Sequence, residues 1–186
     1  MMKKRLDTRS AILEAAFEAF GQNPGASLAE VADLAGVGRA TLHRQFAGRD
    51  DLIRALAEQA MDELDAAVGA AVTDAASYTE GLRLAMEAIL PLALRQMFLA
   101  TEAAVQTGAI AERTEADFVE LVESVKHAQA EGGLRKDVPA EWIARAYDNL
   151  IYAGWDLVRA EEATPRQAAD FAWKTLMDGM GERSNA

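Results

Sequence analysis

The stretch from Ser27 to Phe46, SLAEVADLAGVGRATLHRQF, constrains the fold of this chain more than any other segment. Ser27 is a favourable residue at a helix N-cap, and Glu30, three residues later, completes a capping box. Gly36 follows the apolar residues of this short helix, and glycine can end a helix in the left-handed conformation because it has no Cβ. A second helix starts after Gly38, which is a weaker but acceptable N-cap. The pattern therefore predicts two short helices joined by a tight turn.

The second of these helices is expected to have an apolar inner side and a polar outer side. Leu42 and Phe46 are four residues apart, so both should face inward. Arginine, threonine and histidine on the other side are donors suited to the phosphates and base edges of DNA. We predict that base edges are contacted by Arg39, Thr41 and Arg44 and phosphates by Ser27, His43 and Arg49, with Ala40 on the same outer side. The alternative is an ordinary helical hairpin with a solvated polar face, because such short patterns also arise by chance.

The N-terminal part of the chain resembles a known family. The matching residues are Ile12, Ala15, Ala16, Phe20, Gly25, Ala32, Ala35, Gly36, Thr41, Leu42, Phe46, Arg49, Asp51 and Leu52. Together they make the segment from Thr8 to about Leu56 similar to the DNA-binding domain of the tetracycline-repressor (TetR) family of transcriptional regulators. The chain differs at Gly38, where the family usually has Ser or Thr, and at His43, where it usually has Tyr. The histidine makes the expected phosphate contact more dependent on pH.

Charge is distributed unevenly along the chain. The net charge is −11 over 186 residues, which by itself argues against a nucleic-acid partner. Residues 1–56, however, carry eight Lys and Arg against seven Asp and Glu, a net of +1, so residues 57–186 carry the remaining −12. Because salt screens charges beyond about 10 Å at 0.1 M, the local charge of a contact face matters more than the total. The charge pattern is therefore compatible with DNA binding through the N-terminal part.

Composition disfavours several classes of protein. The chain has no cysteine, which excludes disulfides and thiolate chemistry and fits a reducing cytoplasm. No apolar run reaches the roughly 20 residues of a membrane span, and no apolar segment follows the basic N-terminal residues as in a secretory signal. We expect a cytoplasmic protein with no membrane partner, no cofactor and no metal.

The apolar periodicity is helical throughout, so the expected fold class is all-α with about nine helices. We expect an N-terminal three-helix helix-turn-helix DNA-binding domain over residues 1–49 and a C-terminal helical domain for effector binding and dimerisation over residues 50–186. A helix of roughly 34 Å, from about Asp50 to Val72, would join the two. The other helices are predicted at Thr8–Phe20, Glu80–Leu90, Leu92 to about Val105, Glu112–Glu131, Pro139 to about Glu161 and Thr164–Met180.

The last two predicted helices are apolar over an unusually wide arc. Each arc covers roughly 220°, whereas a surface helix needs an apolar stripe of little more than 100°. A second interface is therefore expected, most simply a two-fold homodimer through a four-helix bundle, and the TetR resemblance implies the same pairing. Its candidate residues are Ala153, Gly154, Leu157, Phe171, Ala172, Trp173, Leu176 and Met180. The alternative is a monomer whose core contains this hairpin.

The resemblance also implies an effector pocket in the C-terminal domain. Methionine and aromatic side chains make adaptable apolar walls, so a ligand there should be largely apolar. The candidate residues are Met61, Leu64, Met86, Leu90, Met97, Phe98, Phe118, Val122, Tyr147, Ile151 and Trp155, with Gln96, Asn149 and Tyr152 as polar groups that could orient the ligand. The alternative for each apolar residue is plain core.

Three functions are compatible with these patterns. The first is a ligand-responsive repressor that binds a palindromic operator as a homodimer and is released by a small, largely apolar effector. The second is a small metal-dependent enzyme, because His127 shares a helix face with Glu123 and Glu131; an ordinary charged stripe has the same spacing. The third is a helical dimerisation module without DNA activity, which would not need the outward donors of Arg39 to Arg44. We favour the repressor and do not expect an enzyme.

Overall fold

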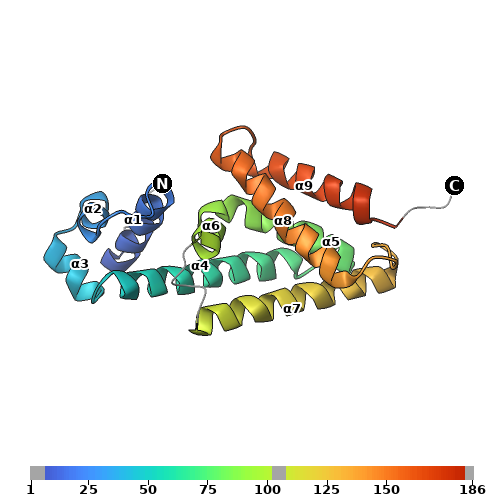
Figure 1. Cartoon of the computed structure of the whole chain (residues 1–186), viewed down its shortest axis with the longest axis horizontal. Coiled ribbons are helices and arrows are strands. Elements are labelled where there is room, and N and C mark those ends of the chain that lie inside the picture. The colour runs from blue at the N-terminus through green and yellow to red at the C-terminus, as the bar shows by residue number, and fades with distance from the viewer. Residues whose placement is uncertain (1–6, 102–107, 183–186) are drawn as a thin grey trace. The chain divides into compact units, whose positions relative to one another are not determined.

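The computed structural model describes residues 7–101 and 108–182, except for the side chains of Leu94, Gln96, Met97 and Thr101 (Figure 1). The predicted roles of Gln96 and Met97 at an effector site therefore fall outside the described side chains. The described part of the chain contains nine α-helices and one 3₁₀ turn, and its one strand-like pairing is an isolated bridge between Leu134 and Gly181. The expected all-α fold is thus confirmed.

The helices begin and end close to the predicted positions. Their bounds are α1 Thr8–Gln22, α2 Leu28–Leu34, α3 Arg39–Gln45, α4 Arg49–Val72, α5 Tyr78–Ile89, η1 Leu90–Leu92, α6 Ala93–Thr101, α7 Gly108–Glu131, α8 Ala140–Arg159 and α9 Pro165–Met180. Pro91 lies in the 3₁₀ turn η1 that separates α5 from α6, because proline cannot donate the hydrogen bond a continuous helix needs. α7 begins four residues earlier than predicted, at Gly108, and the predicted end of α6 near Val105 lies outside the described residues.

The chain divides into two compact units. The first comprises residues 1–62 and 94–111, and the second comprises residues 63–93 and 112–186. The first unit therefore extends beyond the predicted boundary at residue 49 and includes most of α6. The chain passes between the units at residues 62/63, 93/94 and 111/112, and at the first of these crossings the long helix α4 is continuous.

The first unit has a continuous apolar core. α1 contributes Ile12, Leu13, Phe17 and Phe20, and these pack with buried residues of α2, α3 and the first half of α4. Phe98 of α6 joins the same core, where its ring makes an edge-to-face contact with Phe17 at a centroid distance of 5.6 Å. Phe98 is thus a core residue of the unit that carries the helix-turn-helix.

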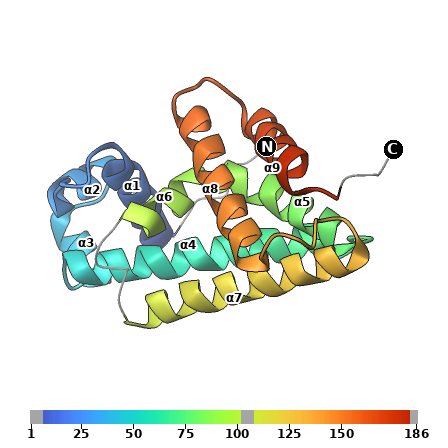
Figure 2. The same cartoon turned by 45° about the vertical axis from the view of Figure 1, so that its right-hand side comes forward.

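The second unit is built around α8 and α9, which lie side by side in both views (Figures 1 and 2). The start of α9 shows the predicted capping box, in which the Thr164 hydroxyl accepts from the amide of Gln167 and the Gln167 side chain accepts from the amide of Thr164. Gly154 of α8 lets the neighbouring elements approach closely, because a Cβ there would lie 3.1 Å from Leu90 and 3.4 Å from the Ala168 carbonyl. In the described ranges no helix is long and apolar enough to cross a membrane.

Candidate DNA-binding surface and effector site

The turn between α2 and α3 has the geometry that the sequence predicts. The Ser27 hydroxyl accepts from the Glu30 amide at 3.2 Å, and the Ser27 amide donates to the Glu30 carboxylate at 2.7 Å. These hydrogen bonds hold the pKa of Glu30 below its ordinary value. Gly36 adopts a φ of +67°, the left-handed conformation expected at the end of α2. The capping box therefore fixes the start of α2, and Gly36 fixes its end, where the amides of Gly36 and Val37 donate to the carbonyls of Asp33 and Ala32.

α3 presents the predicted donors outward. Leu42 and Phe46 are 1% and 2% exposed and anchor the helix to the core of the first unit. Arg39, Ala40, His43 and Arg44 are exposed, and Thr41 is half-buried. The Arg44 guanidinium donates to the Thr41 hydroxyl at 3.3 Å, which links two of the residues assigned to base edges. The outer face is thus a cluster of donors on a rigidly held helix.

Arg49 has partners within its own unit. Its guanidinium donates to the carbonyls of Ala26 at 2.5 Å and Pro24 at 2.6 Å, and lies 4.5 Å from the centre of the Phe20 ring. Arg49 therefore joins the start of α4 to the loop between α1 and α2. Its predicted phosphate contact remains a prediction, while the structure gives this side chain a bracing role.

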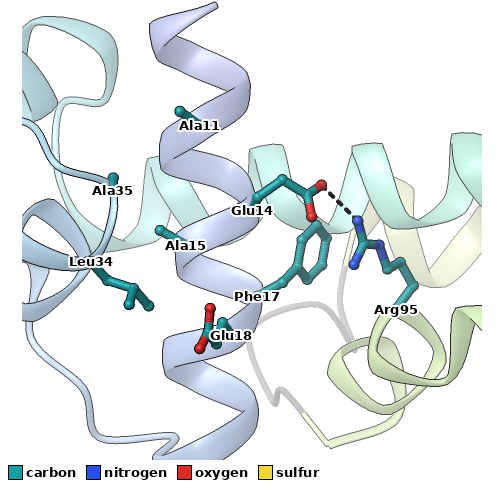
Figure 3. Close-up of a pocket in the computed structure, with 8 residues that line it drawn as sticks. All are labelled: Ala11, Glu14, Ala15, Phe17, Glu18, Leu34, Ala35 and Arg95. Carbon is teal, nitrogen blue, oxygen red and sulfur yellow. Dashed lines mark hydrogen bonds and ion pairs between the residues drawn. The ribbon is translucent and has the colours of Figure 1, made fainter. Parts of the chain in front are cut away.

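A shallow pocket of about 440 Å³ lies on the first unit, along α1 (Figure 3). Ala11 and Ala15 form part of its lining, Leu34 lines it from the α2 side and Arg95 from the α6 side. The Arg95 guanidinium pairs with Glu14 at 2.6 Å and covers the Phe17 ring at 4.4 Å. None of the predicted effector residues lines this pocket, and its charged groups already have partners within the unit.

The predicted effector residues are divided between the two units. Met61 and Phe98 belong to the first, whereas Leu64, Met86, Leu90, Phe118, Val122, Tyr147, Ile151 and Trp155 belong to the second. Within the second unit the Tyr147 hydroxyl donates to the carbonyl of Leu82 at 2.7 Å, which ties α8 to α5. Burial raises the pKa of Tyr147 far above its ordinary value, so its hydroxyl stays protonated as this donor.

Asp148 is a polar residue of α8 that the sequence analysis did not single out. Burial raises its pKa from 3.8 to about 6, and the positive charge of Arg145 offsets part of this effect. The predicted orienting residue Asn149, by contrast, is exposed and donates to the carbonyl of Arg145 within its own helix. A helical projection could have revealed Asp148, because it lies four and seven residues before Tyr152 and Trp155 on one face.

The predicted dimer residues differ in their exposure. Gly154, Ala172 and Leu176 are buried inside the single chain, and their contact with a partner copy stays a prediction. Gly154 lies against Leu90 of η1 and Ala168 of α9. Phe171 is 56% exposed, Ala153 is exposed, and Leu157, Trp173 and Met180 are half-buried. The surface available to a partner is therefore narrower than the predicted arc.

The three residues considered for a metal site have other partners. The His127 ring stacks on Tyr78 at 4.4 Å, Glu123 pairs with Lys126 at 2.8 Å, and Glu131 accepts from the Tyr78 amide at 2.9 Å. Among residues 7–101 and 108–182 no group of three or more His, Cys, Asp or Glu side chains is placed to hold a metal ion. The charged-stripe alternative is the one that fits these contacts.

Comparison with known proteins connects this geometry to a family. Residues 12–56 match the family described as "Bacterial regulatory proteins, tetR family". The chain is also 32% identical over 175 residues to the HTH-type transcriptional repressor LfrR of Mycolicibacterium smegmatis, covering 93% of this chain and 90% of LfrR. The chain belongs to the TetR family. Members of the TetR family are DNA-binding transcription regulators, so the expectation that the chain is not an enzyme is confirmed.

Solved structures show that the TetR likeness extends over the whole fold. The crystal structure of the M. smegmatis TetR-like regulator LfrR in complex with proflavine has a TM-score of 0.75 at 29% identity, covering 92% of this chain and 96% of that one. The structure of AibR in complex with isovaleryl coenzyme A and operator DNA has a TM-score of 0.78 at 23% identity, covering 91% and 97%. This TetR chain therefore shares its fold with those proteins over more than nine-tenths of its length.

Proposed function

We propose that this protein is a ligand-responsive transcriptional repressor that binds a palindromic operator as a homodimer and is released by a small, largely apolar effector. The observation that carries the proposal is the outward donor cluster of α3, held by the buried pair Leu42 and Phe46. The similarity to the repressor LfrR supports the direction of regulation. Such a protein would act where the chromosome is, in the cytoplasm.

Two copies would present two α3 helices to one face of a duplex. A two-fold dimer matches an operator whose half-sites are about 34–36 Å apart or a multiple of that distance. The operator is best found by selecting bound duplexes from a random pool with the purified full chain. Binding should weaken as salt rises, because the protein displaces counterions from phosphates. A chain that binds no duplex at low ionic strength would contradict the proposal.

Arg44→Ala is expected to reduce affinity for the selected operator by roughly 1–3 kcal/mol and to relax preference at one base position, because Arg44 is assigned to a base edge. The measurement is a fluorescence-anisotropy titration against the operator and against single-base variants of it. Arg159→Ala is the matched control, since it removes the same charge from an exposed residue of α8 whose partner is Asp156. Unchanged discrimination among the base variants would exclude Arg44 from base reading.

The dimer is proposed to form through the exposed apolar edge of α8 and α9. Phe171 is 56% exposed on α9, while on α8 Ala153 is exposed and Leu157 is half-buried. Large exposed apolar side chains of this kind are typical of a surface that a partner covers.

Phe171→Glu is expected to shift the protein towards monomer, because a carboxylate would be buried without a partner in the interface. Analytical ultracentrifugation across micromolar concentrations measures the change. Val119→Glu is the matched control, since Val119 of α7 is similarly exposed, at 52%, and lies outside the proposed interface. Equal effects of the two substitutions, or a wild-type chain that is already monomeric, would contradict this interface.

The effector is proposed to bind the second unit. LfrR was solved with proflavine and AibR with isovaleryl coenzyme A and operator DNA, which supports a small-molecule partner beside a DNA partner here. α4 enters both units, so a ligand that favours one position of its C-terminal half would bias the placement of the DNA-binding unit. A small molecule that binds tightly yet leaves operator affinity unchanged would contradict this coupling.

A further inference from the structure

The shallow pocket along α1 combines apolar side chains with two carboxylates (Figure 3). Ala11 and Ala15 of α1 line it together with Leu34 at the end of α2, and Leu34 is 49% exposed. Glu14 and Glu18 are on the same stretch of α1 and bring two negative charges to the pocket. Its volume of about 440 Å³ lies within the roughly 300–1,000 Å³ that is typical of ligand pockets.

The carboxylates of the pocket keep acceptor positions to spare, although each has a partner. Glu14 accepts from Arg95 at 2.6 Å and from the Gln59 side chain at 3.3 Å, and both contacts use Oε1. In the part of the chain that the structure describes, its Oε2 has no partner. Glu18 is exposed and accepts one long hydrogen bond, 3.5 Å from Nε2 of Gln22. Two carboxylates beside one guanidinium therefore favour a further cationic side chain.

The chain itself has a segment that matches this pocket. Residues 1–6, MMKKRL, lie outside the described residues and directly precede α1, whose N-cap is Asp7. The segment has cationic side chains at positions 3–5 and methionine or leucine at its other positions. It is thus cationic and apolar, where the pocket is acidic and apolar, and methionine adapts readily to a shallow surface.

The length of this segment and its point of attachment bring it within reach of the pocket. Leu6 precedes the N-cap, and an apolar residue there often packs on the fourth residue of the helix, here Ala11, which lines the pocket. Glu18 lies roughly 16 Å along the helix axis from Asp7, at 1.5 Å per residue. Six extended residues span about 20 Å. The cationic side chains can therefore reach both Glu14 and Glu18.

We propose that residues 1–6 dock in this pocket of their own chain, with the basic side chains paired to Glu18 and to Oε2 of Glu14 and the apolar ones against Ala15 and Leu34. Docking would hold three positive charges on the unit that carries the helix-turn-helix. DNA phosphates of any sequence would have to compete with the pocket for these charges, so docking would weaken non-specific attachment to DNA. This inference concerns a surface apart from the proposed effector site and does not depend on it.

Other occupants fit the pocket less well. A separate peptide, or the same segment of a second copy, would lose translational freedom on binding, whereas a segment tethered at Asp7 has a high effective concentration. An anion would be repelled by the two carboxylates. A divalent metal needs several oxygen or nitrogen ligands, and no group of three or more such side chains occurs in the described ranges.

Trypsin cleavage at positions 3–5 measures docking in the full chain, because the protease acts on the undocked form of the segment. Mass spectrometry of the intact chain follows the loss of the segment with time. Glu18→Gln should accelerate this cleavage at least threefold, since it removes a charge partner of the segment. Glu58→Gln is the matched control, because Glu58 is an exposed carboxylate of α4 in the same unit and does not line the pocket. Equal cleavage rates in the wild type and Glu18→Gln would overturn the proposal.

A cross-link tests where the segment lies. The chain has no cysteine, so Met2→Cys with Leu34→Cys creates one defined pair, which can bridge only if the two Cα atoms come within about 7 Å. Met2→Cys with Gln45→Cys is the control pair. Gln45 is exposed, and the next residue, Phe46, lies 5.3 Å from the guanidinium of Arg9 at the start of α1, so the segment can reach it.

Under mild oxidation the first pair should form a disulfide within one chain at least tenfold faster than the control pair. Equal rates for the two pairs would mean that the segment has no preferred site and would overturn the proposal. Disulfides that join two chains instead of closing within one would also overturn it, since the occupant would then be a second copy. Electrophoresis without reducing agent distinguishes the two products by mass.

Discussion

Arg49→Ala is expected to lower the free energy of unfolding of the first unit by about 3 kcal/mol. The guanidinium donates to two backbone carbonyls, and hydrogen bonds to a charged group each contribute roughly 1.5–3 kcal/mol. Its position over the Phe20 ring adds roughly 0.5–1 kcal/mol. Ala26 is only 3% exposed, so removal of the Arg49 side chain also leaves the Ala26 carbonyl without this hydrogen-bond donor. The loop between α1 and α2 should then detach from the start of α4.

The measurement can be confined to the unit that is affected. All three tryptophans lie at positions 142, 155 and 173, in the second unit, so their fluorescence reports that unit alone. Hydrogen exchange of α1, α2 and α3 reports the first unit. Arg49→Ala should accelerate exchange in these helices while the tryptophan unfolding curve moves little. Unchanged exchange in α1 to α3 would contradict the bracing role.

Two further variants distinguish bracing from a phosphate contact. Arg49→Lys keeps the charge but lacks the planar fork that reaches two carbonyls, so it should lose most of the stability that the alanine variant loses. Arg54→Ala removes an equal charge from an exposed residue of α4 whose partner is Asp51 at 3.7 Å, and should change stability by less than about 0.5 kcal/mol. If Arg49 only contacted a phosphate, Arg49→Lys would preserve operator affinity. Arg49→Ala would then leave the stability of the first unit unchanged.

Local signals explain how much of this fold the sequence predicts. In each capping box, Ser27 with Glu30 and Thr164 with Gln167, the two partners are three residues apart. Both boxes can therefore be recognised from the sequence alone. Gly36 likewise shows where α2 ends, because the left-handed conformation favours glycine. The outward position of the α3 donors follows from the helical repeat. Each of these features depends on neighbours in sequence.

Long-range partners explain what the sequence does not predict. The carbonyls that Arg49 binds lie 23 and 25 residues earlier, and no local pattern indicates them. From the sequence, Phe98 is assigned to an effector pocket because it is aromatic. In the structure its ring packs on Phe17 in the first unit. The sequence of α9 is apolar over a wide arc, yet a helical projection cannot show which part of that arc the chain itself covers. Ala172 and Leu176 are covered by it, and Phe171 is not.

Asp148→Asn is expected to stabilise the second unit at pH 7.5 by at most about 3 kcal/mol. Burial raises the pKa of this carboxyl from 3.8 to about 6, and that difference corresponds to about 3 kcal/mol of preference for the protonated form in the folded state. At neutral pH the wild type carries the charge against this preference. Asparagine has nearly the same shape and no charge, so the variant avoids the desolvation cost.

The pH dependence follows from the same shift. A group whose folded pKa is raised contributes its full stability below the unfolded pKa of 3.8 and loses it as pH rises through about 6. The difference between Asp148→Asn and the wild type should therefore be small near pH 4, grow between pH 4 and 6, and stay constant above that. Burial raises the pKa of the neighbouring Tyr147 above its ordinary value of 10, so its hydroxyl stays protonated throughout this range.

Urea unfolding followed by tryptophan fluorescence at several pH values measures this difference in the second unit. Asp156→Asn serves as the control, because Asp156 is exposed and pairs with Arg159 at 3.4 Å, and it should change stability by less than about 0.5 kcal/mol at any pH. A variant at Asp148 that is less stable than the wild type at pH 7.5 would mean that the carboxylate already has a favourable partner.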